Sequence, residues 1–229
     1  MKTPKTPDGK IVTRYLDLMV EIKQRIAIID SVIDRSEKGG NYLPPRATYE
    51  VLYLQLRYIC ELIALGSLLM HEDIPATRSA TMMKTYAADH IMTMLHKLKP
   101  DFYPTPIAGA QTRKLSVLPG ETQPRKHHHI TPLKEGYLGR DDLKRLYAKT
   151  GEVLHQGTLK TLLSGQKREI DFTAITDWRD KIIALLKEHI ISIGDGDVKV
   201  IVQMRPLGER AEATTSIAAP AGFRVPGID

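Results

Sequence analysis

Apolar residues recur every three or four positions through most of the first hundred residues, which is the spacing of one face of an α-helix. We expect residues 1–9 to be a mobile lead-in, and the first such run after them predicts a long helix over about residues 10–37. The stretch GGNYLPPRA ends it, because paired glycines and paired prolines do not continue a regular helix. Two further helices are predicted over about residues 46–71 and 77–98. The residue 46–71 helix is apolar on nearly all sides, as expected for the central helix of a bundle.

The pattern changes where KPDFYPTPIAGA, with its three prolines, ends the third predicted helix. The following stretch mixes short apolar runs with basic residues. It predicts a basic loop inserted at about residues 100–135, with RKLSVL and HHHITPL as the arms of a loose hairpin. Helical spacing then returns over about residues 139–157, near 158–164, and as one long apolar stripe over 172–194.

Alternation of apolar and polar residues begins after Gly194. The segments VKVIVQMR and RAEATTSIA, joined by the turn PLGE, predict a β-hairpin over residues 197–219. A lone hairpin is marginally stable in water, so it should pack on the helices or pair with the 113–133 segment. The sequence therefore predicts a mainly α protein, with a bundle of four to six helices over residues 10–194 and a small β-hairpin and tail over 195–229.

The composition is that of a globular chain able to bury a sizeable core, with 229 residues of which 42% are hydrophobic. A formal charge of +6 permits contact with nucleic acid without requiring it. The start of the chain lacks the apolar segment of a signal peptide, and no uncharged apolar run reaches the length of about 18 residues that would predict a membrane span. The single cysteine, Cys60, falls in the apolar central helix, where we expect a core residue. These features predict a cytoplasmic protein without membrane contact.

Motifs for common cofactors and metals are absent from the sequence. It contains no glycine-rich phosphate loop, no nucleophile elbow and no paired-cysteine zinc signature, so we expect no cofactor. The triplet His127–His129 could bind a transition metal, but consecutive strand residues point to opposite faces, so we interpret it as a solvated basic loop. His71 is expected at the surface at a helix end. His90 and His189 lie on apolar faces and are expected in the core.

Three charged residues stand out in the central helix. At about 100° per residue, Glu50, Arg57 and Glu61 lie within about 40° of one another, and Tyr53 flanks them on the same stripe. An arginine between two carboxylates can be satisfied locally, so the set predicts a structural ion network or a polar seam facing another subunit. A catalytic or ligand-binding site is the alternative, because charge in a helical core is costly and a site is one reason to retain it.

A second candidate site lies in RLYAKTGEVLHQG, where Lys149 comes six residues before His155. A helix with a basic residue, a few intervening positions and a histidine resembles the degenerate Arg-then-His signature of the HEPN superfamily, helical bundles that include many ribonuclease toxins. The resemblance implies that His155 is a catalytic residue near an RNA phosphate, although Lys149 stands where the pattern has arginine. On an ideal helix the two residues are about 120° apart, so they share a site only if Gly151 or the helix end distorts the helix. LYAKTGEVLH and LQLRYICELIALG are also similar to uncharacterised bacterial helical proteins.

Two functional hypotheses follow from these patterns. We favour a non-catalytic helical interaction protein that forms a homodimer, because the first two helices offer more apolar face than one bundle covers. The alternative is a HEPN-like ribonuclease or RNA-binding effector, in which Arg57 and His155 approach a phosphate. Tyr53 or Tyr147 would assist. In this alternative, positive charge for RNA comes from the inserted loop, through Arg113, Lys114, Arg125 and Lys126.

Overall fold

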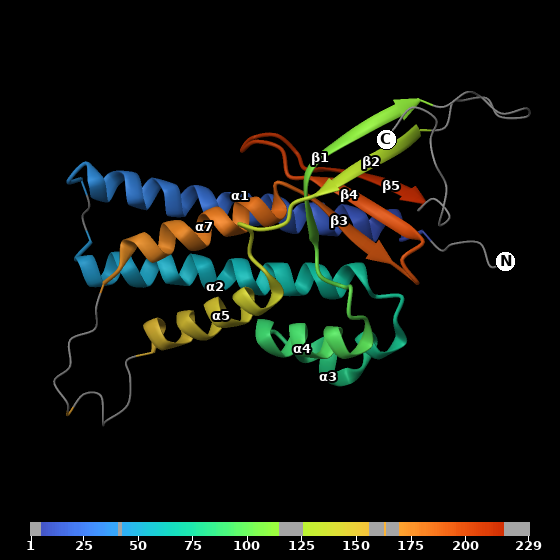
Figure 1. The fold of residues 1–229 in the computed structure, drawn as a ribbon. Helices are drawn as coiled ribbons and strands as arrows, with labels where there is room; N and C mark the ends of the chain where they lie inside the picture. Colours follow the sequence, from blue (N-terminus) through green and yellow to red (C-terminus); the bar gives the residue numbers. More distant parts are fainter. Residues whose placement is uncertain (1–5, 41–42, 115–125, 156–162, 164–169, 218–229) are drawn as a thin grey trace, which may run out of the picture.

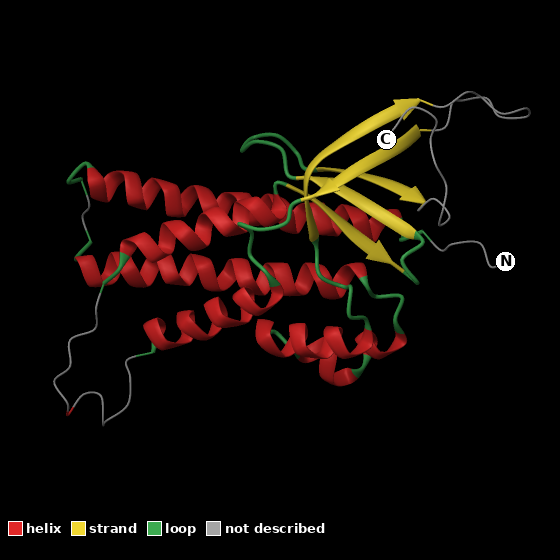
Figure 2. Cartoon of the chain, viewed as in Figure 1, coloured by secondary structure: helices red, strands yellow, loops and turns green. Residues whose placement is uncertain are grey.

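Long helices lying side by side and an antiparallel sheet at one end make up the fold (Figures 1 and 2). The computed structural model describes residues 6–40, 43–114, 126–155, 163 and 170–217. The helices are α1 (Gly9–Glu37), α2 (Pro45–Met70), the 3₁₀ turn η1 (Pro75–Arg78), α3 (Ala80–Lys84), α4 (Ala88–Leu98), α5 (Arg140–Leu154) and α7 (Phe172–Leu186). The strands are β1 (Thr105–Lys114), β2 (Lys126–Pro132), β3 (Glu188–Ile193), β4 (Val198–Gln203) and β5 (Glu212–Ile217).

The predicted mainly α bundle with a small hairpin is wrong, because within the described residues the sheet has five strands. Their order is β2-β1-β3-β4-β5, every pair is antiparallel, and the sheet is curled. The strands β4 and β5 lie where the alternating pattern predicts a hairpin, but they extend a larger sheet. The fold is therefore of the mixed α and β type, with substantial helix.

The first two predicted helices are present with nearly the predicted bounds. The Asp8 carboxylate accepts a hydrogen bond from the backbone N–H of Lys10 and caps α1, and Pro45 opens α2, where a missing N–H costs nothing. Helix α2 contacts α1, α4, α5 and α7, which makes it the central helix, as predicted. Figure 1 shows α1 and α7 on the same side of α2 as the sheet, with α4 and α5 on the other side of α2.

The helix predicted over residues 77–98 is broken into three pieces. Extended backbone at Thr85 and Ala87 separates α3 from α4, so the apolar stripe does not run through as one helix. The buried face of α4 is formed by Ile91, Met92 and Leu95. His90, which the sequence places in the core, is exposed. The short helix expected near residues 158–164 falls almost wholly outside the described residues.

The stripe predicted as helix over residues 172–194 is helical only to Leu186, and its last part is the strand β3. His189 and Ile193 fit a helical spacing, but they also fit a period of two, in which His189, Ile191 and Ile193 point to the buried face. β-Branched isoleucine side chains are restricted at χ1 and pack well on a pleated surface, so this run favours strand. The period-two interpretation holds in the structure.

The insertion predicted as a loop over about residues 100–135 is a long antiparallel hairpin of β1 and β2. It is part of the main sheet, because Thr105 and Pro106 of β1 pair with Ile190 and His189 of β3. The sequence predicts that this insertion is not a core element of the fold, and its pairing with β3 corrects that prediction. The first strand of the hairpin begins at Thr105, before the predicted RKLSVL arm. The prediction missed this start because the small and polar residues that follow Thr105 have a low propensity for strand.

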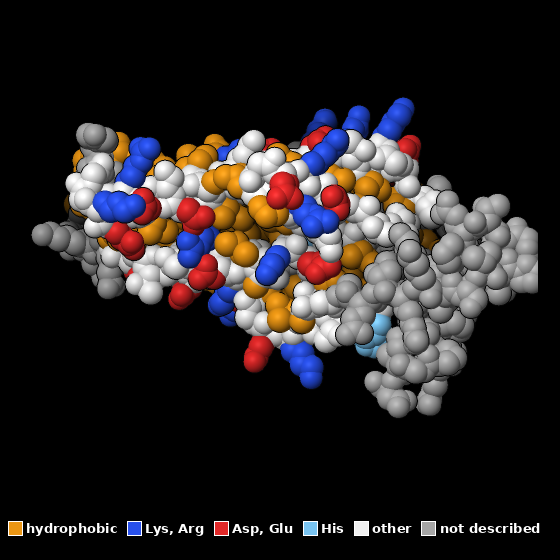
Figure 3. Space-filling model, turned by 90° about the horizontal axis from the view of Figure 1, so that it is seen from above, with side chains coloured by type: hydrophobic (Ala, Val, Ile, Leu, Met, Phe, Trp, Pro, Cys, Tyr) orange, Lys and Arg blue, Asp and Glu red, His pale blue; other side chains and the backbone are white. Residues whose placement is uncertain are grey.

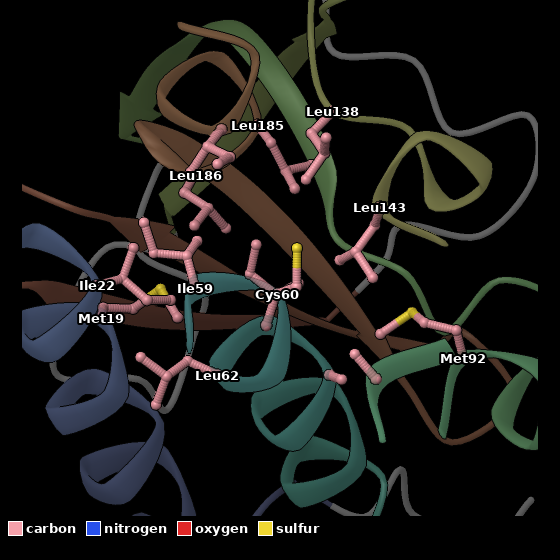
Figure 4. Close-up of a cluster of buried hydrophobic side chains, with 14 of the residues drawn as sticks. Met19, Ile22, Ile59, Cys60, Leu62, Met92, Leu138, Leu143, Leu185 and Leu186 are labelled. Atoms are coloured by element: carbon pink, nitrogen blue, oxygen red, sulfur yellow. The ribbon is translucent and has the colours of Figure 1, made fainter. Parts of the chain in front are cut away.

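The main hydrophobic core lies around α2, where side chains of α1, α4, α5 and α7 meet (Figure 4). Cys60 is fully buried there, and burial raises the pKa of its thiol, which confirms it as a core residue. Helix α2 is long and apolar enough to cross a membrane by length and composition alone. However, 61% of its most apolar window is buried inside this fold, as in the core helix of many soluble proteins.

Two buried histidines connect the helices to the sheet. His189 is confirmed as a core histidine: its Nδ1–H donates to the Leu186 carbonyl at 3.0 Å, and its Nε2 accepts from the Tyr15 hydroxyl at 2.7 Å. His71 was expected at the surface and is instead fully buried. Its two ring nitrogens lie 2.8 Å from the Ser67 carbonyl and 3.1 Å from the Ser192 carbonyl, so this side chain joins the end of α2 to β3.

Candidate functional site

The charged stripe of α2 faces α5, and Arg57 is at its centre. The Arg57 Nη2 donates to the Tyr147 hydroxyl at 2.7 Å, and Nε lies 3.2 Å from a Glu61 carboxylate oxygen. The Nη1 group lies 3.4 Å from the Thr150 hydroxyl. The guanidinium also lies over the Tyr147 ring, 4.3 Å from its centroid. We call Arg57, Glu61, Tyr147 and Thr150 the Arg57 cluster.

The partners of Arg57 also bind one another. The Tyr147 hydroxyl donates to the same Glu61 carboxylate oxygen at 3.3 Å, and the buried Thr150 hydroxyl donates to the Tyr147 carbonyl at 2.7 Å. Burial raises the pKa of Tyr147. The Arg57 guanidinium opposes this rise, and the Glu61 carboxylate adds to it. The phenol therefore stays protonated at neutral pH and can act as a donor. All three guanidinium nitrogens of Arg57 are engaged, which supports a structural role for this arginine.

Glu50 does not belong to the Arg57 cluster. Its carboxylate lies 2.6 Å from the Arg46 Nε, and Arg46 also donates to the Val153 carbonyl at 3.1 Å. The i, i+4 spacing of Arg46 and Glu50 is the sequence signal that could have revealed this pair. Tyr53 is a core residue, 1% exposed and packed against Tyr49 with ring centroids 4.7 Å apart. Burial raises the pKa of Tyr53.

The two HEPN-like positions of α5 are not among the contacts of Arg57. The Lys149 ammonium lies 3.2 Å from Glu152, and both side chains are mostly exposed. His155 is an exposed residue that follows the last residue of α5, and its backbone N–H donates to the Gly151 carbonyl. Helix α5 thus presents Tyr147 and Thr150 to Arg57, while Lys149 lies on its solvent side.

Three of the four basic residues of the predicted RNA contact, Arg113, Lys114 and Lys126, lie on the β1–β2 hairpin. Arg113 pairs with His127 and Lys114 pairs with Lys126 across the two strands, so these three basic residues lie at the same end of the hairpin. Arg125 lies outside the described residues. Figure 1 shows this hairpin on the opposite side of α1 and α2 from α5, and the hairpin and the Arg57 cluster are therefore separate features. Among the described residues, no group of three or more His, Cys, Asp or Glu side chains is placed to hold a metal ion.

Beside the Arg57 cluster, α2 leaves an apolar stripe partly exposed. Tyr58 and Leu65 are each 37% exposed, and the other members are partly buried. The sequence predicts α2 to be apolar on nearly all sides but does not show which side stays uncovered. We call this set the α2 outer stripe; its members are Val51, Leu54, Tyr58, Leu65, Leu68 and Leu69.

A polar network borders the α2 outer stripe on the side of α1. The Arg25 guanidinium lies 4.4 Å from the centroid of the Tyr58 ring. It also donates to the Glu21 carboxylate at 2.5 Å and to the Gln55 side chain at 3.2 Å. The Arg57 cluster borders the stripe on the side of α5. The α2 outer stripe is therefore a partly exposed apolar surface that lies between two polar networks.

Comparison with protein-family models, with curated proteins and with solved structures finds no match to this chain. The resemblance to the HEPN superfamily therefore stays a prediction from the sequence.

Proposed function

We propose that this protein is a non-catalytic interaction protein that self-associates through the α2 outer stripe. The observation that carries the proposal is the row of half-exposed apolar side chains along one side of the central helix, with Tyr58 and Leu65 each 37% exposed. Single exposed apolar residues are common on protein surfaces, but several on one side of a helix favour an interaction surface, here with Glu61 as the polar residue between Tyr58 and Leu65.

A second copy of the chain is the partner that this surface fits best. In a two-fold dimer the same patch meets itself, so an apolar row is complementary to its own copy. Burying a fully exposed leucine or aromatic side chain contributes about 1.5–3 kcal/mol. Tyr58 and Leu65 are already mostly buried, so each contributes about a third of this value, and the six members of the stripe together drive association. Arg25 holds Tyr58 from one side, which fixes the ring before association and reduces the entropy lost on binding.

The contacts of the Arg57 cluster fit this proposal better than the ribonuclease alternative. Each nitrogen of Arg57 already has a partner within the chain, which leaves two of its five donors, and the neighbouring Glu61 carboxylate would repel a phosphate that approached them. Lys149 is paired with Glu152 on the solvent side of α5. The Arg57 cluster then serves to fix α5 against α2 and to form one polar edge of the interface.

The test is the mass of the protein in solution, measured by sedimentation velocity and light scattering from micromolar to millimolar concentration. We expect the wild-type protein to be a dimer and Leu65→Glu to be a folded monomer, because a carboxylate would be buried in the apolar centre of the interface. The matched control is Ile217→Glu, at a residue that is 63% exposed on β5, and this variant should remain a dimer. A wild-type protein that stays monomeric at millimolar concentration would overturn the proposal.

A further inference from the structure

A pocket of about 520 Å³ lies between α1, α7 and the connection from β4 to β5, away from the α2 outer stripe. This volume is within the range of small-molecule sites, about 300–1,000 Å³. Figure 3 views the molecule from the side of α1 and α7 and shows hydrophobic side chains exposed among charged ones on this face. The apolar walls are provided by Ile26, Ala27, Ile183, Met204 and Leu207.

Lys23 lines this pocket and is an unusual residue, because its side chain is a buried cation. Lys23 is only 7% exposed. Its ammonium donates to the Pro206 carbonyl at 3.1 Å and to the Glu209 carbonyl, and so holds the β4–β5 connection against α1. No carboxylate of the described residues forms an ion pair with it. An ammonium has three donors, so one remains for a ligand.

The other charges around the pocket leave it short of anions. The Asp30 carboxylate is paired with Arg179 at 2.5 Å, and Glu188 accepts a hydrogen bond from Gln203 at 2.8 Å. Lys187 is an exposed second lysine at the pocket, and its side chain has no ion-pair partner among the described residues. The pocket therefore combines an apolar wall with three cations, Lys23, Lys187 and Arg205, and two acids. Asp30 and Arg205 each form an ion pair with a residue outside the pocket, whereas Glu188 has the neutral Gln203 amide as its partner.

We propose that this pocket binds a small amphipathic carboxylate, a ligand with an apolar body and one negative charge. The apolar body would lie against Ile26, Ile183 and Met204, and the carboxylate would accept a hydrogen bond from the Lys23 ammonium. Burying a cation is costly unless an anion or several acceptors satisfy it, and a bound carboxylate completes the set that two carbonyls begin. A monoanion matches a single buried ammonium better than a phosphate, for which a fork of arginine donors is the usual partner, because Arg205 at this pocket is already paired with Glu212. The site goes beyond the proposed self-association and does not depend on it.

The test uses octanoate as the probe and octanol as the matched uncharged probe, with calorimetry and the backbone amide resonances of residues 204–211 as readouts. We expect octanoate to bind and to shift these resonances, and octanol to bind at least about tenfold more weakly, because the charged hydrogen bond is lost. The variant Lys23→Met should lower the affinity for octanoate by a similar factor and leave the affinity for octanol unchanged. The same change at Lys10, an exposed residue of α1, is the control and should have no effect.

A second variant keeps the test independent of the structural role of Lys23. Ala27→Phe should fill the pocket from α1 and abolish binding of both probes, while the Lys23 contacts with the β4–β5 connection remain. Equal affinity for octanoate and octanol, or wild-type octanoate binding by the folded Lys23→Met or Ala27→Phe protein, would overturn the proposal. Absence of octanoate binding, with resonances of residues 204–211 that shift with protein concentration, would also overturn it and assign the pocket to a second copy.

Discussion

Acid should destabilise this protein through His189, because the fold keeps its imidazole neutral in the core. The Leu186 carbonyl accepts from Nδ1–H and the Tyr15 hydroxyl occupies Nε2, so both ring nitrogens of the neutral form are satisfied. Protonation would place a cation in a fully buried site. Burial accordingly lowers the pKa of His189 from 6.5 to about 4.

The size and sign of the effect follow from proton binding in the two states. Between pH 6.5 and about 4 the unfolded chain binds a proton at His189 and the native protein does not, so the free energy of unfolding falls as the pH falls through this window. At about 1.4 kcal/mol for each pH unit, the loss reaches about 3 kcal/mol and stops growing once the pH is below the native pKa. A loss of this size is a large share of the roughly 5–15 kcal/mol that stabilises a typical domain.

Urea unfolding followed by circular dichroism across the same pH window measures this loss. The control is the double variant Tyr15→Phe with His189→Leu, which replaces both hydrogen-bonding partners by apolar side chains and so leaves no buried hydroxyl without a partner. Burial also lowers the pKa of His71, but that histidine is present in both proteins, so the difference between the two curves isolates His189. Parallel stability curves for the wild-type and double-variant proteins would refute the reasoning.

Two further predictions concern the α2 packing, and denaturant midpoints measure both. Arg57→Met should lower the free energy of unfolding by about 1–3 kcal/mol, because Glu61 then lies mostly buried without its cation; an unchanged midpoint with loss of RNA cleavage would support the ribonuclease alternative instead. Gly66→Ala should destabilise by about 1 kcal/mol, because the new Cβ would lie 3.0 Å from Cε2 of the hydrogen-bonded Tyr15. Gly151→Ala is the matched control: its nearest contact would be at 3.9 Å, so it should instead stabilise by up to about 1 kcal/mol, and equal effects of the two changes would contradict this account.

Much of the helical part could be predicted because its local signals agree with the packing. The apolar spacing and the GGNYLPPRA break give α1 and α2 nearly their observed bounds. The strand β3 could not be separated from α7 by spacing alone, since His189 and Ile193 fit both periods. The partners of β1 are even less accessible to sequence reasoning, because the pairing of Thr105 with Ile190 joins segments that are far apart in the chain.

The candidate site shows the same division between local and distant information. The common face of Arg57 and Glu61 follows from helix geometry, and the structure confirms their ion pair. Which residues of α5 meet them depends on tertiary packing. Lys23 was overlooked, although it stands four residues after Met19 and three before Ile26, within the apolar stripe of α1. A lysine at such a position is a sequence signal for a buried cation.

The connectivity of the sheet fixes the order in which the protein can be completed. The hairpin β1–β2 and the meander β3–β4–β5 each form from neighbouring segments, but they join through only two residue pairs, Thr105 with Ile190 and Pro106 with His189. Between them the chain runs through α5 and α7. During synthesis the hairpin is therefore made long before its partner strand exists, and closing the sheet carries the entropy cost of a long loop. The edge of β1 that pairs with β3 stays without its partner until the last third of the chain has been synthesised. In contrast, α1 and α2 can pack together as soon as both have been made.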